Sequence, residues 1–346
     1  AWPLLVGGLF LQAIPDLMRP GLFFGRTVDP GFRDSEAARA IRRRYSVAVW
    51  VVTLIALGLA VAAGLARAGA LARLAAHPGL RPVLWLFQIA VAAVSFALAN
   101  RATRPHALQR QSVVTVELPA RPEAPSTIIV ATLALPLVSL AVLAAWIASH
   151  WHAVPAQVPI HWRFDRIDGW MATSPASVAA LLLLDTLVCL LPAALAWGVL
   201  YGSRRVTMSG SAADRERRFR TRAVALLIFA EYCAALPAWA ELLPLPMKAM
   251  RLGEMVFPLV ALILTASLVL VGQGGSRGLR RGEAGAVGDR TDDRHWLLGI
   301  LYFNRADPAF LVEKRFGVGY SFNFAHPLAW TLLAVVVVIA LLSRIL

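Results

Sequence analysis

The segment TDDRHWLLGILYFNRADPAFLVEKRFGVGYSFNFAHP, residues 291–327, is the longest well-patterned polar stretch of a very apolar chain. It lies between two apolar runs, 252–271 and 328–345, each long enough to cross a bilayer as a helix. Two stretches have an apparent period of two residues, separated by a Gly-Val-Gly turn: Phe310, Val312, Lys314 and Phe316 alternate with Leu311, Glu313 and Arg315, and Tyr320, Phe322 and Phe324 alternate with Ser321 and Asn323. Because such alternation is typical of half-buried strands, we predict a small antiparallel meander packed under a helical bundle.

The remainder of the chain predicts that bundle. Hydrophobic residues make up 58% of the chain and charged residues only 16%, outside the ordinary range of soluble proteins. The apolar runs are continuous rather than alternating, which disfavours a porin-like barrel. The predicted fold is an all-α integral membrane bundle of about eight transmembrane helices, with a small cytoplasmic β-hairpin insert before the last helix. The six earlier spans are predicted at 2–18, 46–66, 81–100, 127–149, 176–201 and 223–243.

The chain is expected to divide into four regions. Ala1 lies in an apolar run, so the native start is expected to precede it, and no cleavable signal peptide is predicted. A basic helix is expected just before the second span, with Ser35 as its N-terminal cap. The regions are a three-helix membrane region at 1–126, a two-helix unit with an outer loop at 127–202, a two-helix region at 203–272, and the insert with the last helix at 273–346.

Arginine and lysine are distributed unevenly among the loops, which predicts the orientation. Cytoplasmic loops of membrane proteins carry an excess of these residues. Four loops carry four to eight each, whereas the alternate loops carry two or three. We therefore expect a bacterial inner-membrane protein with the loop 150–175 outside. The loops expected in the cytoplasm are 19–45, 101–126, 203–222 and 273–325.

The net charge of +14 would indicate nucleic-acid binding in a soluble protein. Here the charge lies in short loops between spans, so no nucleic-acid partner is expected. The phosphate-binding, zinc-protease and hydrolase motifs are absent, and no cofactor is predicted. Cys189 and Cys233 both lie in apolar runs and are expected to pack as small hydrophobic residues. No protein partner can be inferred from the sequence.

Two interpretations of the polar segment 291–327 stay open. It is either a structural plug that orders the last two spans, or a cytoplasmic site for a ligand or partner. Asn and Asp residues in its turns can bond their own backbone, which favours the plug. The residues that would form the site are Asp292, Asp293, Asn304, Asp307 and Asn323, and the motif of this segment also includes Trp296 and Arg315.

The outer loop concentrates histidine, tryptophan and aspartate. One interpretation is a hydrogen bond between His161 and Asp168 that holds the loop as a lid on the bundle. Another is a zinc or copper site, because imidazole suits both metals, although the spacing matches no established motif. Candidate metal ligands are His150, His152 and His161, and candidate ligand-binding residues of the loop are His161, Trp162, Asp165 and Asp168.

Two carboxylates, Asp185 and Glu231, fall inside predicted spans. A carboxylate at membrane depth is costly unless it is paired or hydrated, so its default interpretation is functional. Facing each other, the two could carry a proton or coordinate a cation. The structural alternative is a protonated carboxyl group that bonds a neighbouring helix.

Three motifs resemble bacterial membrane-protein families. The pattern W-x-x-G-x-x-Y-x-N-x-x-D-P followed by V-x-K-R-x-G-x-G, at 296–319, resembles a C-terminal domain of unknown function found in multi-pass membrane proteins. Pro159, His161 and Trp162 resemble the P-x-H-[FW] loop of the SdpI-like toxin-immunity proteins, with Arg166 or a deletion in place of the usual glycine. The loop at 24–27, followed by the basic helix, is similar to a loop of the same group.

Three functions are therefore considered. The resemblance implies an immunity, sensing or binding protein that takes a hydrophobic peptide or lipid at the outer side of the membrane. The buried carboxylates favour an ion- or proton-coupled transporter instead. An intramembrane enzyme is the third alternative, and it requires the carboxylates to meet His161 in one cavity.

Overall fold

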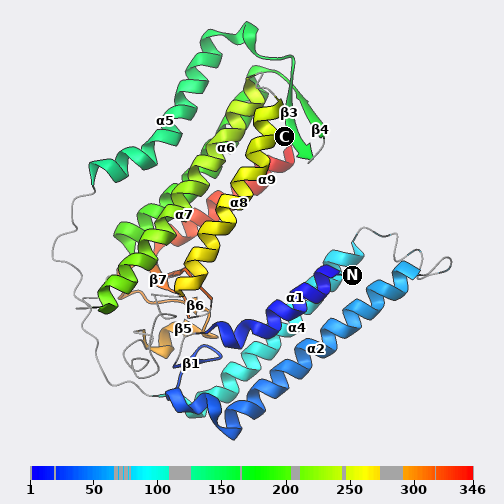
Figure 1. Cartoon of the computed structure of the whole chain (residues 1–346), viewed down its shortest axis with the longest axis vertical. Helices are drawn as coiled ribbons and strands as arrows, with labels where there is room; N and C mark the ends of the chain where they lie inside the picture. Colours follow the sequence, from blue (N-terminus) through cyan, green and yellow to red (C-terminus); the bar gives the residue numbers. More distant parts are fainter. Residues whose placement is uncertain are drawn as a thin grey trace. The chain divides into compact units, whose positions relative to one another are not determined.

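The protein is mostly helical (Figure 1). The computed structural model describes residues 2–18, 21–65, 69, 73, 77, 79–108, 126–163, 166–203, 211–243, 247–272, 291–315 and 317–345. The helices are α1 (Trp2–Ala13), α2 (Glu36–Leu65), α4 (Leu80–Thr103), α5 (Thr127–Ser149), α6 (Pro175–Trp197), α7 (Ser211–Leu242), α8 (Met247–Val271) and α9 (Pro327–Ile345).

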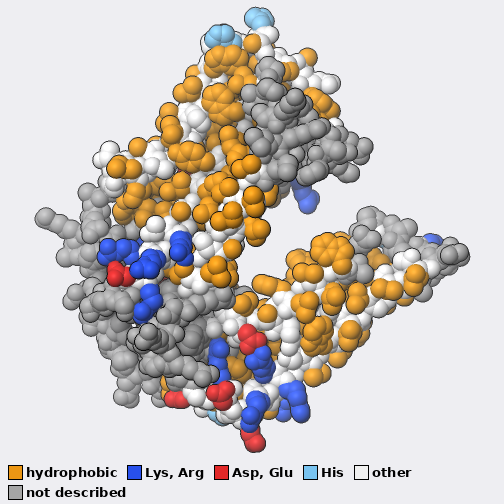
Figure 2. Space-filling view, in the orientation of Figure 1, with side chains coloured by type: hydrophobic (Ala, Val, Ile, Leu, Met, Phe, Trp, Pro, Cys, Tyr) orange, Lys and Arg blue, Asp and Glu red, His pale blue; other side chains and the backbone are white. Residues whose placement is uncertain are grey.

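Six helices in the described part of the chain are long and apolar enough to cross a membrane. Only 11% to 28% of each most apolar window is buried inside the protein, so most of its apolar side chains face outward. Figure 2 shows these hydrophobic side chains along the helices. Such a surface is unfavourable in water and is typical of helices in lipid, which indicates a multi-pass membrane protein. Two further apolar helices, Trp2–Leu17 and Val256–Val271, are shorter, so the predicted count of eight is not confirmed.

The second span begins earlier than predicted. The basic stretch and the apolar run form one continuous helix, α2, rather than two elements. Ser35 precedes it, and the Ser35 hydroxyl accepts a hydrogen bond from the Ala38 amide at 3.2 Å, as expected of an N-cap. The first turns of α2, which carry the arginines, therefore lie outside its apolar region.

By packing, the chain forms two units, and segments from both ends of the sequence contribute to the first. Unit 1 contains Ala1–Val114, Leu279–Phe303 and Lys314–Gly317. In it α1, α2 and α4 pack pairwise, and the loop between α1 and α2 folds against them. Unit 2 contains Thr115–Gly278, Asn304–Glu313 and Val318–Leu346, with α6 packed against α5, α7 and α9.

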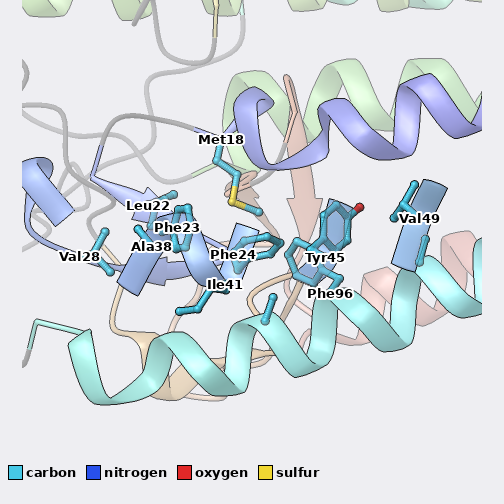
Figure 3. Close-up of a cluster of buried hydrophobic side chains, with 12 residues drawn as sticks. Met18, Leu22, Phe23, Phe24, Val28, Ala38, Ile41, Tyr45, Val49 and Phe96 are labelled. Carbon is cyan, nitrogen blue, oxygen red and sulfur yellow. The ribbon is translucent and has the colours of Figure 1, made fainter. Parts of the chain in front are cut away.

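The loop core of unit 1 is built on one face of α2. Ala38, Ile41, Tyr45 and Val49 recur every three or four residues, and all four are buried (Figure 3). Phe24 from the loop packs on this face, with its ring centroid 5.2 Å from that of Tyr45. The loop is therefore anchored by apolar contacts as well as by the polar contacts described below.

Among the described residues, the strands form four separate two-stranded antiparallel sheets. The two strands predicted within 310–324 are confirmed as a hairpin of β7 and β8. The predicted single meander is wrong, because the preceding residues 296–302 form a second, separate hairpin. β7 also does not alternate in burial, since Phe310, Leu311 and Val312 are all buried. The strands are β1 (Leu22–Phe23), β2 (Arg26–Thr27), β3 (Gln157–Arg163), β4 (Arg166–Ala172), β5 (Trp296–Leu297), β6 (Leu301–Tyr302), β7 (Leu311–Glu313) and β8 (Tyr320–Phe322).

Candidate functional site

Arg315 is the centre of the polar contacts of unit 1. Its side chain is 1% exposed, and it follows β7 in the glycine-containing turn. Nη1 donates to Asp293 Oδ1 at 2.7 Å and to the Gly25 carbonyl at 2.8 Å. Nη2 donates to the Thr291 carbonyl at 2.6 Å. One guanidinium thus joins the α1–α2 loop to the C-terminal segment, using the fixed fork geometry that lysine lacks.

Asp293 completes the contact from the other side. Its carboxylate accepts hydrogen bonds from the Thr27 hydroxyl at 2.9 Å and from the Thr27 amide at 3.2 Å. The guanidinium carbon of Arg315 also lies 4.8 Å from the ring centroid of Trp296, which is a cation–π geometry. Two of the predicted motif residues, Asp293 and Trp296, therefore bind a third, Arg315.

The backbones of the two segments approach closely beside this ion pair. A Cβ placed on Gly299 would lie 2.5 Å from the Gly25 Cα, and one placed on Gly25 would lie 2.6 Å from the Gly299 Cα. Both glycines have positive φ, 71° and 77°. Each therefore needs to be glycine for its conformation and for the space it leaves to the other. Asn100, from α4, adds a hydrogen bond to the Phe24 carbonyl at 2.6 Å.

The remaining motif residues form a separate cluster in unit 2, around Asn323. This side chain is fully buried. Its Nδ2 donates to the carbonyls of Asn304 at 2.9 Å, Asp307 at 3.1 Å and Ala309 at 3.2 Å. Its Oδ1 accepts from the amides of Asn304 and Ala325, both at 3.1 Å. One amide side chain thereby satisfies the backbone groups of a turn that leads into α9.

The motif predicted from the sequence is therefore divided between the two units. Asp293, Trp296 and Arg315 come together in unit 1, and Asn304, Asp307 and Asn323 come together in unit 2. The buried side chains among them bind the protein's own backbone and each other. This geometry supports the structural interpretation of the segment 291–327, and the prediction of a ligand or partner site there stays a prediction.

The outer loop folds as the hairpin of β3 and β4. Val158 is fully buried in the core that α5, α6 and α7 share, so the hairpin is mounted on the end of these helices. Asp165 and the side chains of His161, Trp162 and Asp168 lie outside the described residues. The backbone register places His161 opposite Gly169, but the predicted bond between His161 and Asp168 stays untested.

The histidines that precede the hairpin are exposed. The His150 ring stacks on Trp146 with centroids 4.9 Å apart, and its Nδ1 lies 2.9 Å from the Ser149 hydroxyl. No group of three or more His, Cys, Asp or Glu side chains that could hold a metal occurs in the part of the chain that the structure describes. His150 and His152 are described, whereas the side chain of His161 is not. The zinc or copper site therefore stays a prediction.

The two carboxylates predicted to lie within spans are on adjacent helices of unit 2. Asp185 is on α6 and Glu231 on α7, and both are buried, Glu231 completely. Cys189 lies one turn after Asp185, and its thiol is 3.6 Å from the Glu231 carbonyl oxygen. Asp185 and Glu231 therefore lie on the two helices that meet at this contact.

These carboxylates lack the hydrogen bonds that buried polar groups normally have. Both carboxyl oxygens of Glu231 and Oδ2 of Asp185 are buried without a hydrogen-bond partner among the described residues. The hydroxyl groups next to them in the sequence, those of Thr186 and Tyr232, donate to the Leu182 and Thr132 carbonyls instead. The structural alternative of a carboxyl group bonded to these residues is therefore not what the structure shows.

Several residues of these clusters were missed by sequence reasoning. Gly25 and Thr27 belong to a loop that resembles a known motif, yet nothing in the sequence indicated their contact with Arg315. Gly299 lies in the turn between two strands of two residues each, which are too short to give a pattern in the sequence. Cys189 was interpreted only as a packing residue.

Comparison with known proteins gives one match. Residues 305–330 match a family of unknown function (DUF5808). This segment includes Asp307 and Asn323, so the match covers the Asn323-centred turn and the start of α9. No curated protein matches the chain, and no solved structure matches it. These findings support an apolar, multi-helical membrane protein of unknown activity with a DUF5808-like C-terminal segment.

Proposed function

We propose that the protein binds a proton or a small cation inside the membrane, between Asp185 and Glu231, and that it works as an ion- or proton-coupled transporter. The observation that carries this proposal is the Glu231 side chain, which is fully buried with neither oxygen hydrogen-bonded among the described residues.

An unpaired carboxylate in this position is unfavourable. A charged Asp at the centre of a membrane helix costs about 3 kcal/mol on insertion scales, and an unsatisfied buried polar group adds to that cost. A bound proton or cation removes the charge. A second acidic group, Asp185, lies on the adjacent helix one turn before Cys189, whose thiol contacts the Glu231 backbone carbonyl, and a proton could pass to it. The two helices thus offer the groups that such a carrier needs.

Flux measurements on reconstituted liposomes test the proposal. A pH-sensitive dye is enclosed, a pH gradient is imposed, and sodium or potassium is supplied on one side. The wild type is expected to dissipate the gradient, whereas Glu231→Gln and Asp185→Asn lose most of this activity. Both changes remove the titrating group and keep its shape.

Asp214→Asn is the matched control, because Asp214 is an exposed carboxylate in the first turn of α7. It should transport like the wild type. Thermal melting in detergent checks that every variant is folded. Absence of flux in the wild type, or wild-type flux in both carboxylate variants, rejects the transporter.

A second function is favoured by the outer hairpin. Trp170, on β4, is 53% exposed although the hairpin itself is anchored through Val158. An exposed tryptophan on a rigid support is suited to binding a hydrophobic peptide or a lipid. This fits the resemblance to the SdpI-like immunity group. Trp170→Ala should then abolish protection or ligand binding and leave ion flux unchanged; unaltered protection would reject this function.

We further propose an orientation in the bacterial inner membrane, with the β3–β4 hairpin outside and the basic loops 19–45, 101–126, 203–222 and 273–325 in the cytoplasm. The uneven distribution of arginine and lysine supports it. It places the α1–α2 loop of unit 1 on the cytoplasmic side.

A further inference from the structure

The hairpin of β5 and β6 in unit 1 exposes its apolar side chains. Five large hydrophobic residues that follow one another around this hairpin are between 43% and 63% exposed. The hairpin lies outside every candidate span, where such exposure is unusual. The five are Leu297, Leu298, Ile300, Leu301 and Phe303.

The buried contacts of the hairpin fix which of its side chains are exposed. Trp296 and Tyr302, paired across the two strands, are buried, with ring centroids 5.1 Å apart. Trp296 is held by Arg315, and Gly299 is fitted against Gly25. The aromatic residues with polar groups thus point inward and the purely apolar residues outward, the reverse of the usual arrangement in water.

The turn at the tip of the hairpin also exposes a large apolar side chain, that of Leu298. Leu298 has a φ of 53°, in the left-handed region that a leucine rarely adopts. This conformation places a large apolar side chain at the turn, where glycine or asparagine is the ordinary choice. A leucine at this position is explained if its side chain has an apolar environment to enter.

The hairpin lies at the end of unit 1 that carries exposed arginines. Its contact with Gly25 places it at the loop that leads into α2, and Asn100 joins the same loop to the last turns of α4. Figure 2 shows basic side chains at this end of unit 1, beyond the hydrophobic surface of its helices. The exposed arginines at the start of α2 and around the end of α4 are Arg39, Arg42, Arg43, Arg44, Arg101 and Arg104, of which Arg42 pairs with Asp16.

We propose that this end of unit 1 is an anionic-lipid binding surface. The side chains of Leu297, Leu298 and Ile300 enter the boundary between headgroups and acyl chains, and the arginines bind the lipid phosphates. Exposed apolar residues beside a basic cluster are the composition by which interfacial segments bind anionic bilayers. The hydrophobic faces of α1, α2 and α4 lead into the same surface, so a bilayer fits it better than a soluble partner does.

The test uses the full chain in nanodiscs that contain phosphatidylcholine and phosphatidylglycerol. In the background for labelling, Cys189 and Cys233 are replaced by Ala, and thermal melting checks that this protein is folded. Leu298→Cys is then introduced and labelled with an environment-sensitive dye. We expect blue-shifted emission that is quenched by lipids with a nitroxide near the carbonyl. Asp34→Cys, an exposed polar position of the same unit, is the control and should be quenched by iodide only.

Two results would overturn lipid insertion. Quenching of the Leu298→Cys label by iodide would show that the hairpin faces water. Blue-shifted emission that neither lipid nitroxide nor iodide quenches would show that protein covers it, from a second copy or from another part of the chain.

A second measurement tests the arginines. Energy transfer from the protein to fluorescent lipids should show a several-fold preference for phosphatidylglycerol over phosphatidylcholine. The double variant Arg43→Gln/Arg44→Gln should lose most of this preference.

Added inorganic phosphate should leave the preference unchanged, which separates a lipid site from a phosphate site. Equal energy transfer to both lipids in the wild type, an unchanged preference in the variant, or its loss on adding phosphate contradicts the proposal. Neither measurement depends on ion flux, so the result stands whether or not the protein is a transporter.

Discussion

Arg315 contacts four residues of unit 1 through one side chain: Gly25, Thr291, Asp293 and Trp296. A buried guanidinium is costly unless its donors are used, and here the partners are two carbonyls and a carboxylate. The lysine that precedes it is exposed, although the two are equivalent in charge and adjacent in sequence. Burial, and not charge alone, therefore distinguishes their roles.

Replacing Arg315 should destabilise unit 1. Arg315→Met leaves the Asp293 carboxylate without its counter-ion and is expected to cost about 3 kcal/mol, because removing one partner of a buried pair leaves the other charge uncompensated. Arg315→Lys should recover only part of this loss, since lysine cannot donate to three separate acceptors in the same geometry. Thermal melting in detergent measures the effect.

Arg294→Met is the control for this prediction. The Arg294 side chain is 76% exposed and pairs with Asp292 at the surface. An exposed pair contributes less than about 1 kcal/mol, so the melting temperature should hardly change. Equal melting temperatures for the Arg315 and Arg294 variants would contradict the assigned role.

Among the elements, the hairpin of β5 and β6 depends most on glycine. Gly299→Ala introduces a Cβ 2.5 Å from the Gly25 Cα, a backbone atom that cannot move aside. Gly317 has nearly the same φ, 72° against 71°, but open space around its Cα. Gly317→Ala therefore measures the conformational cost alone.

Gly299→Ala should lower the free energy of unfolding by about 2 kcal/mol more than Gly317→Ala does. This difference is the usual size of an overpacking cost. Comparing the thermal or denaturant midpoints of the two variants isolates the close approach of the backbones. If the two substitutions cost the same, the contact between Gly25 and Gly299 does not form.

At the scale of the whole molecule, the proposed orientation predicts which loops are accessible. His152→Cys, before the outer hairpin, should react with a membrane-impermeant maleimide in intact cells. Asp34→Cys, in the α1–α2 loop, should react only after the membrane is permeabilised, because charge asymmetry places that loop in the cytoplasm. The cysteine-free background supplies the control, and the reverse labelling pattern rejects the orientation.

The elements could be predicted where their signals are local. Continuous apolar runs predicted helices because each must satisfy its own backbone in lipid. Ser35 was identified as a cap because the capping bond spans three residues. The alternation around Glu313 and Ser321 predicted the β7–β8 hairpin, since a short turn joins its strands.

The candidate site was predictable only in part. Asp185 and Glu231 stood out as charges in apolar runs, but the contact of Cys189 with the Glu231 carbonyl depends on how α6 and α7 pack. The bond from Arg315 to Gly25 joins residues 290 positions apart. Contacts of this length have no periodic signal in one sequence, because they are selected by the packing of whole elements.

The sequence by itself determined the membrane class of this protein, its helical character, its charge asymmetry and one of its hairpins. Each follows from the solvation of side chains or from hydrogen bonds over a few residues. Only the tertiary structure divided the segment 291–327 between two units, exposed the apolar face of β5 and β6, and left Glu231 buried without a hydrogen-bond partner among the described residues. Those outcomes depend on which surfaces meet, and distant segments decide that together.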